Sequence, residues 1–211
     1  MTMPAAADRL GAHFERLYDG DADPWRVRER WYEQRKRALV LAALPQARYR
    51  HAYEAGCGNG EMTMALALRC DTVLAADLSA AALRLTGQRL RGAGQCIHVT
   101  LEQHRLPGDW PGDRTQAFDL IVLSEIAYYL EADELARVAA QSAATLAPGG
   151  TLVLCHWRAP FPDRRLSTEQ AHGAFDASPG LHRLLRHDEA DFLLEVWSND
   201  DRSVAQREGL R

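Results

Sequence analysis

Lysine is almost absent from this sequence: Lys36 is the only one, and all the other fixed cations are arginines. We interpret this bias as the codon usage of a GC-rich genome. A basic excess is absent as well, because 29 acidic residues outnumber 25 lysines and arginines and the net charge is −4. Surfaces that bind polyanions usually carry a basic excess. We therefore expect no nucleic-acid partner.

Cysteines and long apolar runs are also scarce. The four cysteines lie far apart and form no CxxC pair, which argues against a disulfide framework and against a zinc site. No apolar run reaches the roughly 18 residues that a membrane span needs. The first ten residues lack the basic and apolar regions of a signal peptide. We expect a soluble cytoplasmic protein without a membrane partner.

Short apolar runs alternate with amphipathic segments from residue 50 onward. Strands are predicted over residues 51–56, 71–77, 95–101, 117–125 and 150–157, and helices over residues 61–69, 79–92, 132–146 and 167–176. Ser79 is a candidate N-cap, and "APGG" is a candidate glycine stop for the helix 132–146. This alternation is typical of an α/β fold, a parallel sheet with helices on both faces.

The two ends of the chain differ from this pattern. Residues 8–18 and 26–44 have helical spacing of apolar residues, and Pro45 stops the second helix. Residues 181–198 hold two strand-like runs, which we interpret as an antiparallel pair at one edge of the sheet. We expect one domain over residues 1–211, with an N-terminal helical cap or lid over 1–45 and a core over 50–198.

A glycine-rich loop, "EAGCGNGE", follows the first predicted strand. Gly56, Gly58 and Gly60 give the spacing E-x-G-x-G-x-G, whereas a dinucleotide-binding loop needs its third glycine at position 61. Glu61 stands there, and its carboxylate would repel a pyrophosphate. Glu54 adds a second acid near the strand end. These charges disfavour an NAD(P) dehydrogenase and suit S-adenosylmethionine, which carries an ammonium and a sulfonium and has no phosphate.

Asp77 ends the second predicted strand in "VLAADLS". A carboxylate at this point can accept hydrogen bonds from two ribose hydroxyls. The alternative is a helix cap, because Ser79 follows. Its register with the glycine loop favours ribose binding.

At these motifs the chain resembles the class I S-adenosylmethionine-dependent methyltransferases, over residues 50–197. The resemblance implies a Rossmann-like sandwich with a seven-stranded, mostly parallel sheet of strand order 3-2-1-4-5-7-6. It implies that "EAGCGNG" holds the methionine part of the cofactor, that "AAD" ends in the ribose-binding acid, that "LEQHRLP" reads the adenine, and that "FDLIVLSE" is the fourth-strand motif. The cofactor-binding residues that follow are Glu54, Gly56, Cys57, Gly58, Asn59, Gly60, Asp77, Leu78, Glu102, Gln103 and Ser124.

Three further stretches resemble the nodulation protein S family. They are "FERLYDGDADPWRVRERWYEQRK", "SEIAYYL" and "CHWR". Members of that family are small bacterial methyltransferases, and their type member methylates the free amino group of a deacetylated chitooligosaccharide. The resemblance implies N-methylation of an amino sugar, a chitooligosaccharide or a small biosynthetic amine by in-line displacement. S-adenosyl-L-methionine is then the donor and S-adenosyl-L-homocysteine the product.

The helix predicted to begin at residue 26 carries Trp31 and Arg35 at i and i+4 spacing. Such a helix could cover the cofactor, with Arg35 on the methionine carboxylate and an aromatic face near the sulfonium. The alternative is an amphipathic helix that simply packs on the sheet. Trp25 follows Pro24 and is expected to be an anchor.

The candidate catalytic residues are Glu125, Tyr128 and His156. Glu125 could attract an ammonium and accept a proton, or it could be an acid at a helix start. Tyr128 or its neighbour Tyr129 could stack on a sugar or pack in the core. Strand alternation predicts His156 and Arg158 in the substrate cleft, with Trp157 on the other face. The alternative for His156 is a structural histidine.

Base methylation, O-methylation and a non-catalytic role are the competing functions. Base methylases of this class usually carry a D/N-P-P-Y stretch where this chain has "SEIAY", so base methylation is disfavoured. An O-methyltransferase acting on a small hydroxyl compound stays open and would need a firmer base. A non-catalytic cofactor-binding module also stays open, although the intact "EAGCGNG" weighs against it.

Overall fold

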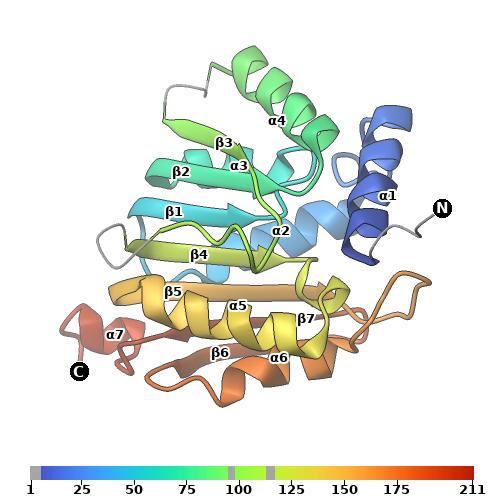
Figure 1. Ribbon diagram of the computed structural model, residues 1–211. Helices are drawn as coiled ribbons and strands as arrows, with labels where there is room; N and C mark the ends of the chain where they lie inside the picture. The colour runs from blue at the N-terminus through green and yellow to red at the C-terminus, as the bar shows by residue number, and fades with distance from the viewer. Residues whose placement is uncertain (1–5, 95–97, 113–116) are drawn as a thin grey trace.

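A single seven-stranded sheet forms the centre of the computed structural model, which describes residues 6–94, 98–112 and 117–211 (Figure 1). The strand order is β3-β2-β1-β4-β5-β7-β6, so the predicted order is confirmed. Strands β1 to β5 are parallel, whereas β7 is antiparallel to both β5 and β6. The strands are β1 Tyr49–Ala55, β2 Cys70–Asp77, β3 Val99–Gln103, β4 Phe118–Ser124, β5 Leu146–Trp157, β6 His182–Asp188 and β7 Phe192–Ser198.

Helices cover both faces of the sheet. They are α1 Ala6–Gly20, α2 Trp31–Ala43, α3 Glu61–Ala67, α4 Ala80–Gly92, α5 Ala132–Thr145, α6 Thr168–Asp176 and α7 Val204–Arg207, with a 3₁₀ turn, η1, over Ala127–Tyr129. Helices α5 and α6 pack on one face, and α2 and α3 lie behind the other (Figure 1). No helix in these described ranges has the length and apolar character to cross a membrane.

Strand β4 shows why its sequence is apolar throughout. Ile121 and Leu123 belong to the core under α5, while Leu120 and Val122 belong to the core on the α2 side. All four side chains are fully buried. A central strand of a parallel sheet meets helices on both faces, so it needs a continuous apolar run.

Two predicted boundaries are wrong. Helix α2 begins at Trp31, because the Asp23 carboxylate accepts the amides of Val27 (2.8 Å) and Arg28 (3.1 Å) and holds this segment in a turn. Helix α5 ends at Thr145, because the C-cap residue Leu146 is already extended, and "APGG" belongs to β5. The Ser79 N-cap is confirmed by a 3.1 Å bond from the Ala82 amide. Residues 95–97 of the predicted third strand lie outside the described residues.

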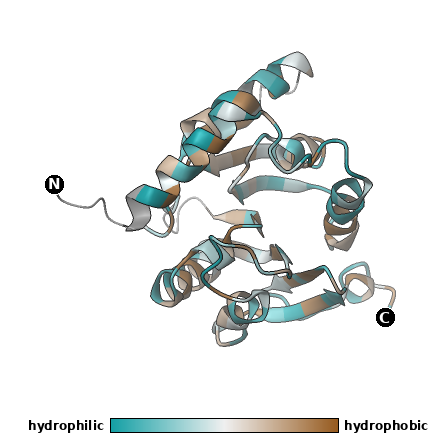
Figure 2. Cartoon of the chain, turned by 90° about the vertical axis from the view of Figure 1, so that its right-hand side faces the viewer, coloured by the Kyte–Doolittle hydropathy of each residue, from teal (hydrophilic) through white to brown (hydrophobic). Residues whose placement is uncertain are grey.

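The N-terminal segment is fixed at the carboxyl edge of the sheet. Glu15 of α1 accepts hydrogen bonds from the Ser79 hydroxyl (2.7 Å) and the Ala81 amide, both at the start of α4. The Asn59 side chain donates to the Ala22 carbonyl (3.1 Å) and to Asp23. Figure 2 views the molecule from this edge, on the side where α1 lies. In an open α/β sheet this edge is where ligands bind.

Candidate active site

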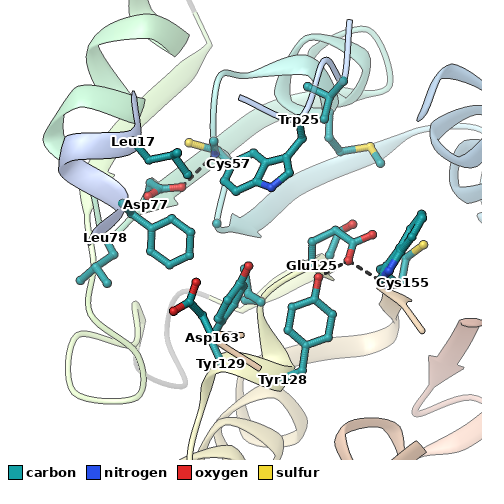
Figure 3. Close-up of a pocket in the computed structure, with 18 of the residues that line it drawn as sticks. Leu17, Trp25, Cys57, Asp77, Leu78, Glu125, Tyr128, Tyr129, Cys155 and Asp163 are labelled. Atoms are coloured by element: carbon teal, nitrogen blue, oxygen red, sulfur yellow. Dashed lines mark hydrogen bonds between the residues drawn. The ribbon is translucent and has the colours of Figure 1, made fainter. Parts of the chain in front are cut away.

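A cavity of about 790 Å³ lies at the carboxyl edge of the sheet. Its walls come from α1, the α1–α2 connection, α2, the loops after β1 to β5, and η1. Figure 3 shows the side chains that point into it, with Asp77 and Cys57 at one end and Glu125 and Tyr128 at the other. This volume is within the range of about 300–1,000 Å³ that small-molecule sites occupy.

The glycine loop approaches the cavity with its backbone. Gly56 has φ 74°, and a Cβ there would collide with the Ile126 side chain. Gly58 has φ 56°, and its Cβ would lie 2.6 Å from the Tyr18 hydroxyl. Both positions therefore need glycine for conformation and for space. Gly60, the third, is the N-cap of α3 in a left-handed conformation.

Glu54 and Asp77 place two buried carboxylates at neighbouring strand ends. The Thr63 hydroxyl donates to Glu54 (2.6 Å), and burial raises the pKa of Glu54 to about 8. Asp77 accepts the amides of Ser79 and Gly58, each at 2.9 Å, and burial raises its pKa as well. Asp77 thus organises the loop and the α4 turn, as the capping alternative predicted, and it also lines the cavity. Both acids gain from a cationic or hydroxyl-rich ligand.

The residues present fit S-adenosylmethionine. Gly56 and Gly58 have no room for side chains, the two buried acids suit an ammonium and a ribose, and these acidic groups offer no counter-charge to a pyrophosphate. The predicted cofactor-binding residues that line the cavity are Glu54, Gly56, Cys57, Gly58, Asn59, Asp77, Leu78 and Ser124.

The two residues predicted to read adenine lie elsewhere. Glu102 and Gln103 pair in the sheet with Ala76 and Asp77. Glu102 contacts His104 at 2.9 Å, and Gln103 donates to the Leu78 carbonyl at 2.9 Å. Neither lines the cavity, because the loop that reaches it begins only after β3. His104, Arg105 and Leu106 line it instead.

Trp31 and Arg35, predicted to lie over the cofactor, are placed away from the cavity. Trp31 is 73% exposed, and Arg35 makes two hydrogen bonds to Glu189, at 2.8 and 2.7 Å. Neither residue lines the cavity. The face of α2 that does so carries Glu33, Lys36, Arg37 and Val40, the i, i+3, i+4, i+7 set of one helix face.

Lys36 lies at the end of the cavity that Glu125 and Tyr128 form. Its isolation among arginines had been interpreted as codon usage. Its ammonium is 2.6 Å from Glu125 Oε1 and 3.0 Å from Glu33 Oε2. Burial alone would lower the pKa of Lys36, but the carboxylates of Glu125 and Glu33 outweigh it and raise that pKa. The lysine is therefore a permanent cation. The i, i+3 spacing of Glu33 and Lys36 was the one feature of the sequence that could have indicated this ion pair.

Glu125 is held by three donors. Lys36 binds Oε1, while the Trp157 amide (2.9 Å) and the Tyr128 hydroxyl bind Oε2. Figure 3 shows the contact between Glu125 and Tyr128. The residue has φ 58°, which is uncommon outside glycine. Burial and the Glu125 charge raise the pKa of Tyr128, so its hydroxyl stays protonated. The predicted pair Glu125 and Tyr128 is brought together.

Aromatic rings form the outer wall next to this cluster. The Tyr129 ring lies 5.1 Å from Phe14 of α1 and 5.5 Å from Phe161, while Trp25 packs on Phe14 at 6.3 Å. All four residues line the cavity. His13 and Asp163 approach to 3.6 Å and connect α1 with the loop after β5.

The predicted orientation at the end of β5 is wrong. Trp157 lines the cavity, whereas His156 is fully buried on the opposite face and contacts His172 of α6 at 3.0 Å. Arg158 pairs with Asp188 (2.5 Å) and Glu169 (3.1 Å) instead of entering the cleft. Side chains do alternate along β5 as predicted, but Trp157, not His156, is the one that faces the cavity.

Comparison with known proteins gives a consistent set of matches. The profile described as "Methyltransferase domain" matches residues 52–150. Nodulation protein S of Sinorhizobium fredii is 31% identical over 133 residues, and that of Rhizobium tropici is 30% identical. Each match covers 62% of this chain but only 59% and 53% of those proteins, so the chain spans less than two thirds of their length.

Solved structures agree with these matches. A crystal structure described as a methyltransferase from Pseudomonas syringae is 45% identical, with a TM-score of 0.68, and the match covers 80% of this chain and 99% of that one. The N-methyltransferase NodS from Bradyrhizobium japonicum WM9, in complex with S-adenosyl-L-homocysteine, is 24% identical with a TM-score of 0.75. That match covers 89% of this chain and 97% of the other.

Proposed function

We propose that this chain, which belongs to the class I S-adenosylmethionine-dependent methyltransferases, methylates the nitrogen of an amine. The acceptor class is an amino sugar, a chitooligosaccharide or a small biosynthetic amine. The likeness to nodulation protein S and to an N-methyltransferase structure supports this choice. The observation that carries it is the state of Glu125, whose carboxylate already receives a lysine, a tyrosine and a backbone amide.

The donor end of the cavity would hold the cofactor through the glycine loop and the carboxyl ends of β1 and β2. S-adenosylmethionine supplies a methyl group already activated on a sulfonium. The glycine loop gives it backbone without side chains, Glu54 receives its ammonium, and Asp77 receives its ribose hydroxyls. The protein then has to orient the acceptor and exclude water, which is the main task in a displacement with an activated donor.

Hydrogen-bond direction defines what the acceptor must offer. The Tyr128 hydroxyl donates its one hydrogen to Glu125, which also accepts from Lys36 and from the Trp157 amide. The lone pairs of Tyr128 Oη are left to accept a hydrogen from a group in the cavity. An amine N–H fits this position. When the nitrogen gains the methyl group, the carbon–sulfur bond of the donor breaks and the product leaves as an ammonium, so the transfer itself needs no proton acceptor.

The same geometry favours nitrogen over oxygen as the methyl acceptor. A neutral amine needs no base before it attacks, whereas a hydroxyl must lose its proton. Glu125 has its lone pairs occupied by Lys36, Trp157 and Tyr128, so it is not a free base for a hydroxyl.

The N-terminal residues would act as the lid of this site. Phe14, Trp25 and Lys36 all line the cavity and come from α1, from the α1–α2 connection and from α2. Removing water by such a wall strengthens the electrostatic interactions inside.

Incubation with isotope-labelled cofactor and a panel of acceptors tests the proposal. The panel holds free amino sugars, deacetylated chitooligosaccharides, small amines, and the matching compounds with a hydroxyl in place of the amine. We expect a one-methyl mass gain on amines alone. Methylation of the hydroxyl compounds without the amines would establish O-methylation instead.

A further inference from the structure

A chain of three buried hydrogen bonds runs behind the acceptor end of the cavity. The Ala127 amide donates to His156 Nε2 at 3.0 Å, His156 Nδ1 contacts His172 Nε2 at 3.0 Å, and His172 Nδ1 contacts Glu195 at 3.0 Å. His156 and Glu195 are fully buried, and His172 is 3% exposed. The chain links η1, β5, α6 and β7, and the methyl-transfer chemistry described above uses none of its side chains.

The two ends of this chain determine where its protons lie. A backbone amide can only donate, so His156 Nε2 is unprotonated and its proton sits on Nδ1. That proton is given to His172 Nε2, so the proton of His172 sits on Nδ1 and is given to Glu195. Both imidazoles are therefore neutral, each in its Nδ1–H form.

Glu195 anchors the far end as a carboxylate. Burial alone would raise its pKa, but the hydrogen bond from His172 and the guanidiniums of Arg183 and Arg186 outweigh burial and lower it. Arg186 donates to the second oxygen at 2.7 Å and Arg183 at 3.1 Å. The carboxylate thus stays ionised and keeps accepting from His172.

The chain has no place for an additional proton. A proton on His172 Nε2 would face the Nδ1–H of His156. His156 cannot change its tautomer, because its Nε2 accepts the Ala127 amide. Burial and the neighbouring cations also lower the pKa of His156. The ionisable groups around the pair are Lys36 of α2, Tyr128 of η1, Arg164 of the loop after β5, Glu195 of β7, and Arg183 and Arg186 of β6.

The near end of the chain holds the acceptor wall. Ala127 is the first residue of η1, which carries Tyr128 and Tyr129. The Tyr128 carbonyl in turn accepts the amide of Arg165 at 2.9 Å, and its hydroxyl binds Glu125. His156 supplies a partner for the buried Ala127 amide, which fixes the orientation of this turn on the sheet.

We propose that His156 and His172 are positioning residues that hold the Tyr128 turn in place and release it when the pair takes up a proton. This inference rests on the proposed function, because it assigns Tyr128 to the acceptor. It adds a built-in sensitivity to acid that lies outside the cavity.

Nitrogen NMR of the histidine side chains tests the chain without any turnover. Spectra of the ¹⁵N-labelled protein, assigned with the variants His156→Gln and His172→Gln, report which ring nitrogen carries the proton. We expect both residues in the Nδ1–H form at pH 7.5. An Nε2–H form or a charged ring in either residue at that pH would refute the proposed hydrogen-bond chain, whatever the protein methylates.

Acceptor kinetics test the positioning role. His156→Leu leaves the Ala127 amide without a partner, and we expect KM for the amine to rise tenfold or more. Affinity for S-adenosylhomocysteine should change less than twofold, because the donor end is untouched. His156→Gln, whose amide oxygen can accept from Ala127, should recover most of the loss. His182→Leu, on exposed β6, is the matched control and should equal wild type.

The pH dependence separates the pair from the amine. As the pH falls below the ordinary histidine range, which begins at about 6.5, the KM of wild type should rise more steeply than that of His172→Gln, since the amine's own titration is common to both proteins. Parallel profiles, or an unchanged KM in folded His156→Gln and His156→Leu, would refute the positioning role while leaving N-methylation intact. If His156→Leu does not fold, the glutamine variants and the NMR spectra still decide.

Discussion

Lys36 Nζ lies 2.6 Å from Glu125 Oε1, so the single lysine of the chain neutralises the carboxylate at the acceptor end of the cavity. The two residues are 89 positions apart. Their side chains are 8% and 30% exposed, so the pair is largely withdrawn from solvent.

Lys36→Met should destabilise the protein. It removes one partner of a mostly buried ion pair and leaves Glu125 and Glu33 facing each other. Such a change costs about 3–5 kcal/mol in fully buried pairs, and we expect a smaller loss here because the Glu125 side chain is 30% exposed. Urea unfolding measures this loss. Lys36→Arg keeps the charge and should lose less. A double variant with Glu125→Gln should recover part of the loss, because the stranded charge is gone. Equal stability of Lys36→Met and wild type would refute the pairing.

Glu54 should make cofactor binding depend on pH. With its pKa at about 8, the carboxyl is largely protonated at pH 7 in the ligand-free protein. The cofactor's ammonium favours the ionised form, so binding should release a proton, and affinity should rise from pH 6 to pH 8. Calorimetry at pH 7 in two buffers of different ionisation heat measures this release. Glu54→Gln should release none and bind about tenfold to a hundredfold more weakly.

The same raised pKa should lower the stability of the ligand-free protein as pH rises. Between the ordinary value of about 4.5 and 8 the folded state binds more protons at Glu54 than the unfolded state. Stability from this group is therefore complete below that window and is lost through it. Glu54→Gln should melt a few degrees higher than wild type at pH 8 and show a smaller difference at pH 5. An identical difference at both pH values would contradict the assignment.

Gly58→Ala should weaken both folding and cofactor binding. The new Cβ would lie 2.6 Å from the Tyr18 hydroxyl at φ 56°, and left-handed backbone alone costs about 1–2 kcal/mol for a non-glycine residue. Adding Tyr18→Phe should relieve the collision but keep the backbone cost. Gly92→Ala, which meets nothing within 4 Å, is the control. Melting curves and S-adenosylhomocysteine affinity provide the measurement.

Arg35→Ala should leave cofactor affinity within twofold of wild type. Its guanidinium is committed to Glu189 on the far side of α2, and exposed ion pairs of this kind contribute little to stability. Calorimetry with S-adenosylhomocysteine checks the result. A tenfold loss of affinity would restore the original assignment of Arg35 to the methionine carboxylate.

The parts of the site predicted from sequence are those fixed by local order. Gly56, Gly58 and Asp77 follow strand ends, and parallel strands bring their carboxyl ends to one edge without further information. The continuous apolar run of β4 likewise specified a central strand. These features depend on residues that are neighbours along the chain.

The predictions failed where the orientation of a helix or strand face, or a contact between residues distant in sequence, determines which side chains enter the cavity. Glu33 and Lys36 are three positions apart and share one face of α2, while Trp31 and Arg35 share another. Helical spacing alone does not determine which of these two faces turns toward the cavity. At β5 a shift of one residue exchanges His156 for Trp157. Lys36 depends on Glu125 for its role, and no local pattern connects them.

The Asn59 amide, bonded to Ala22 and Asp23, joins the glycine loop to the α1–α2 connection. The loop proposed to hold the donor and the segment that covers the cavity are consequently linked. We expect the spent donor to leave when this cover loosens, so that exchange of donor, more than bond-making, sets the turnover rate. A burst of product in the first turnover would reveal it, and Asn59→Ala should shorten the slow phase that follows.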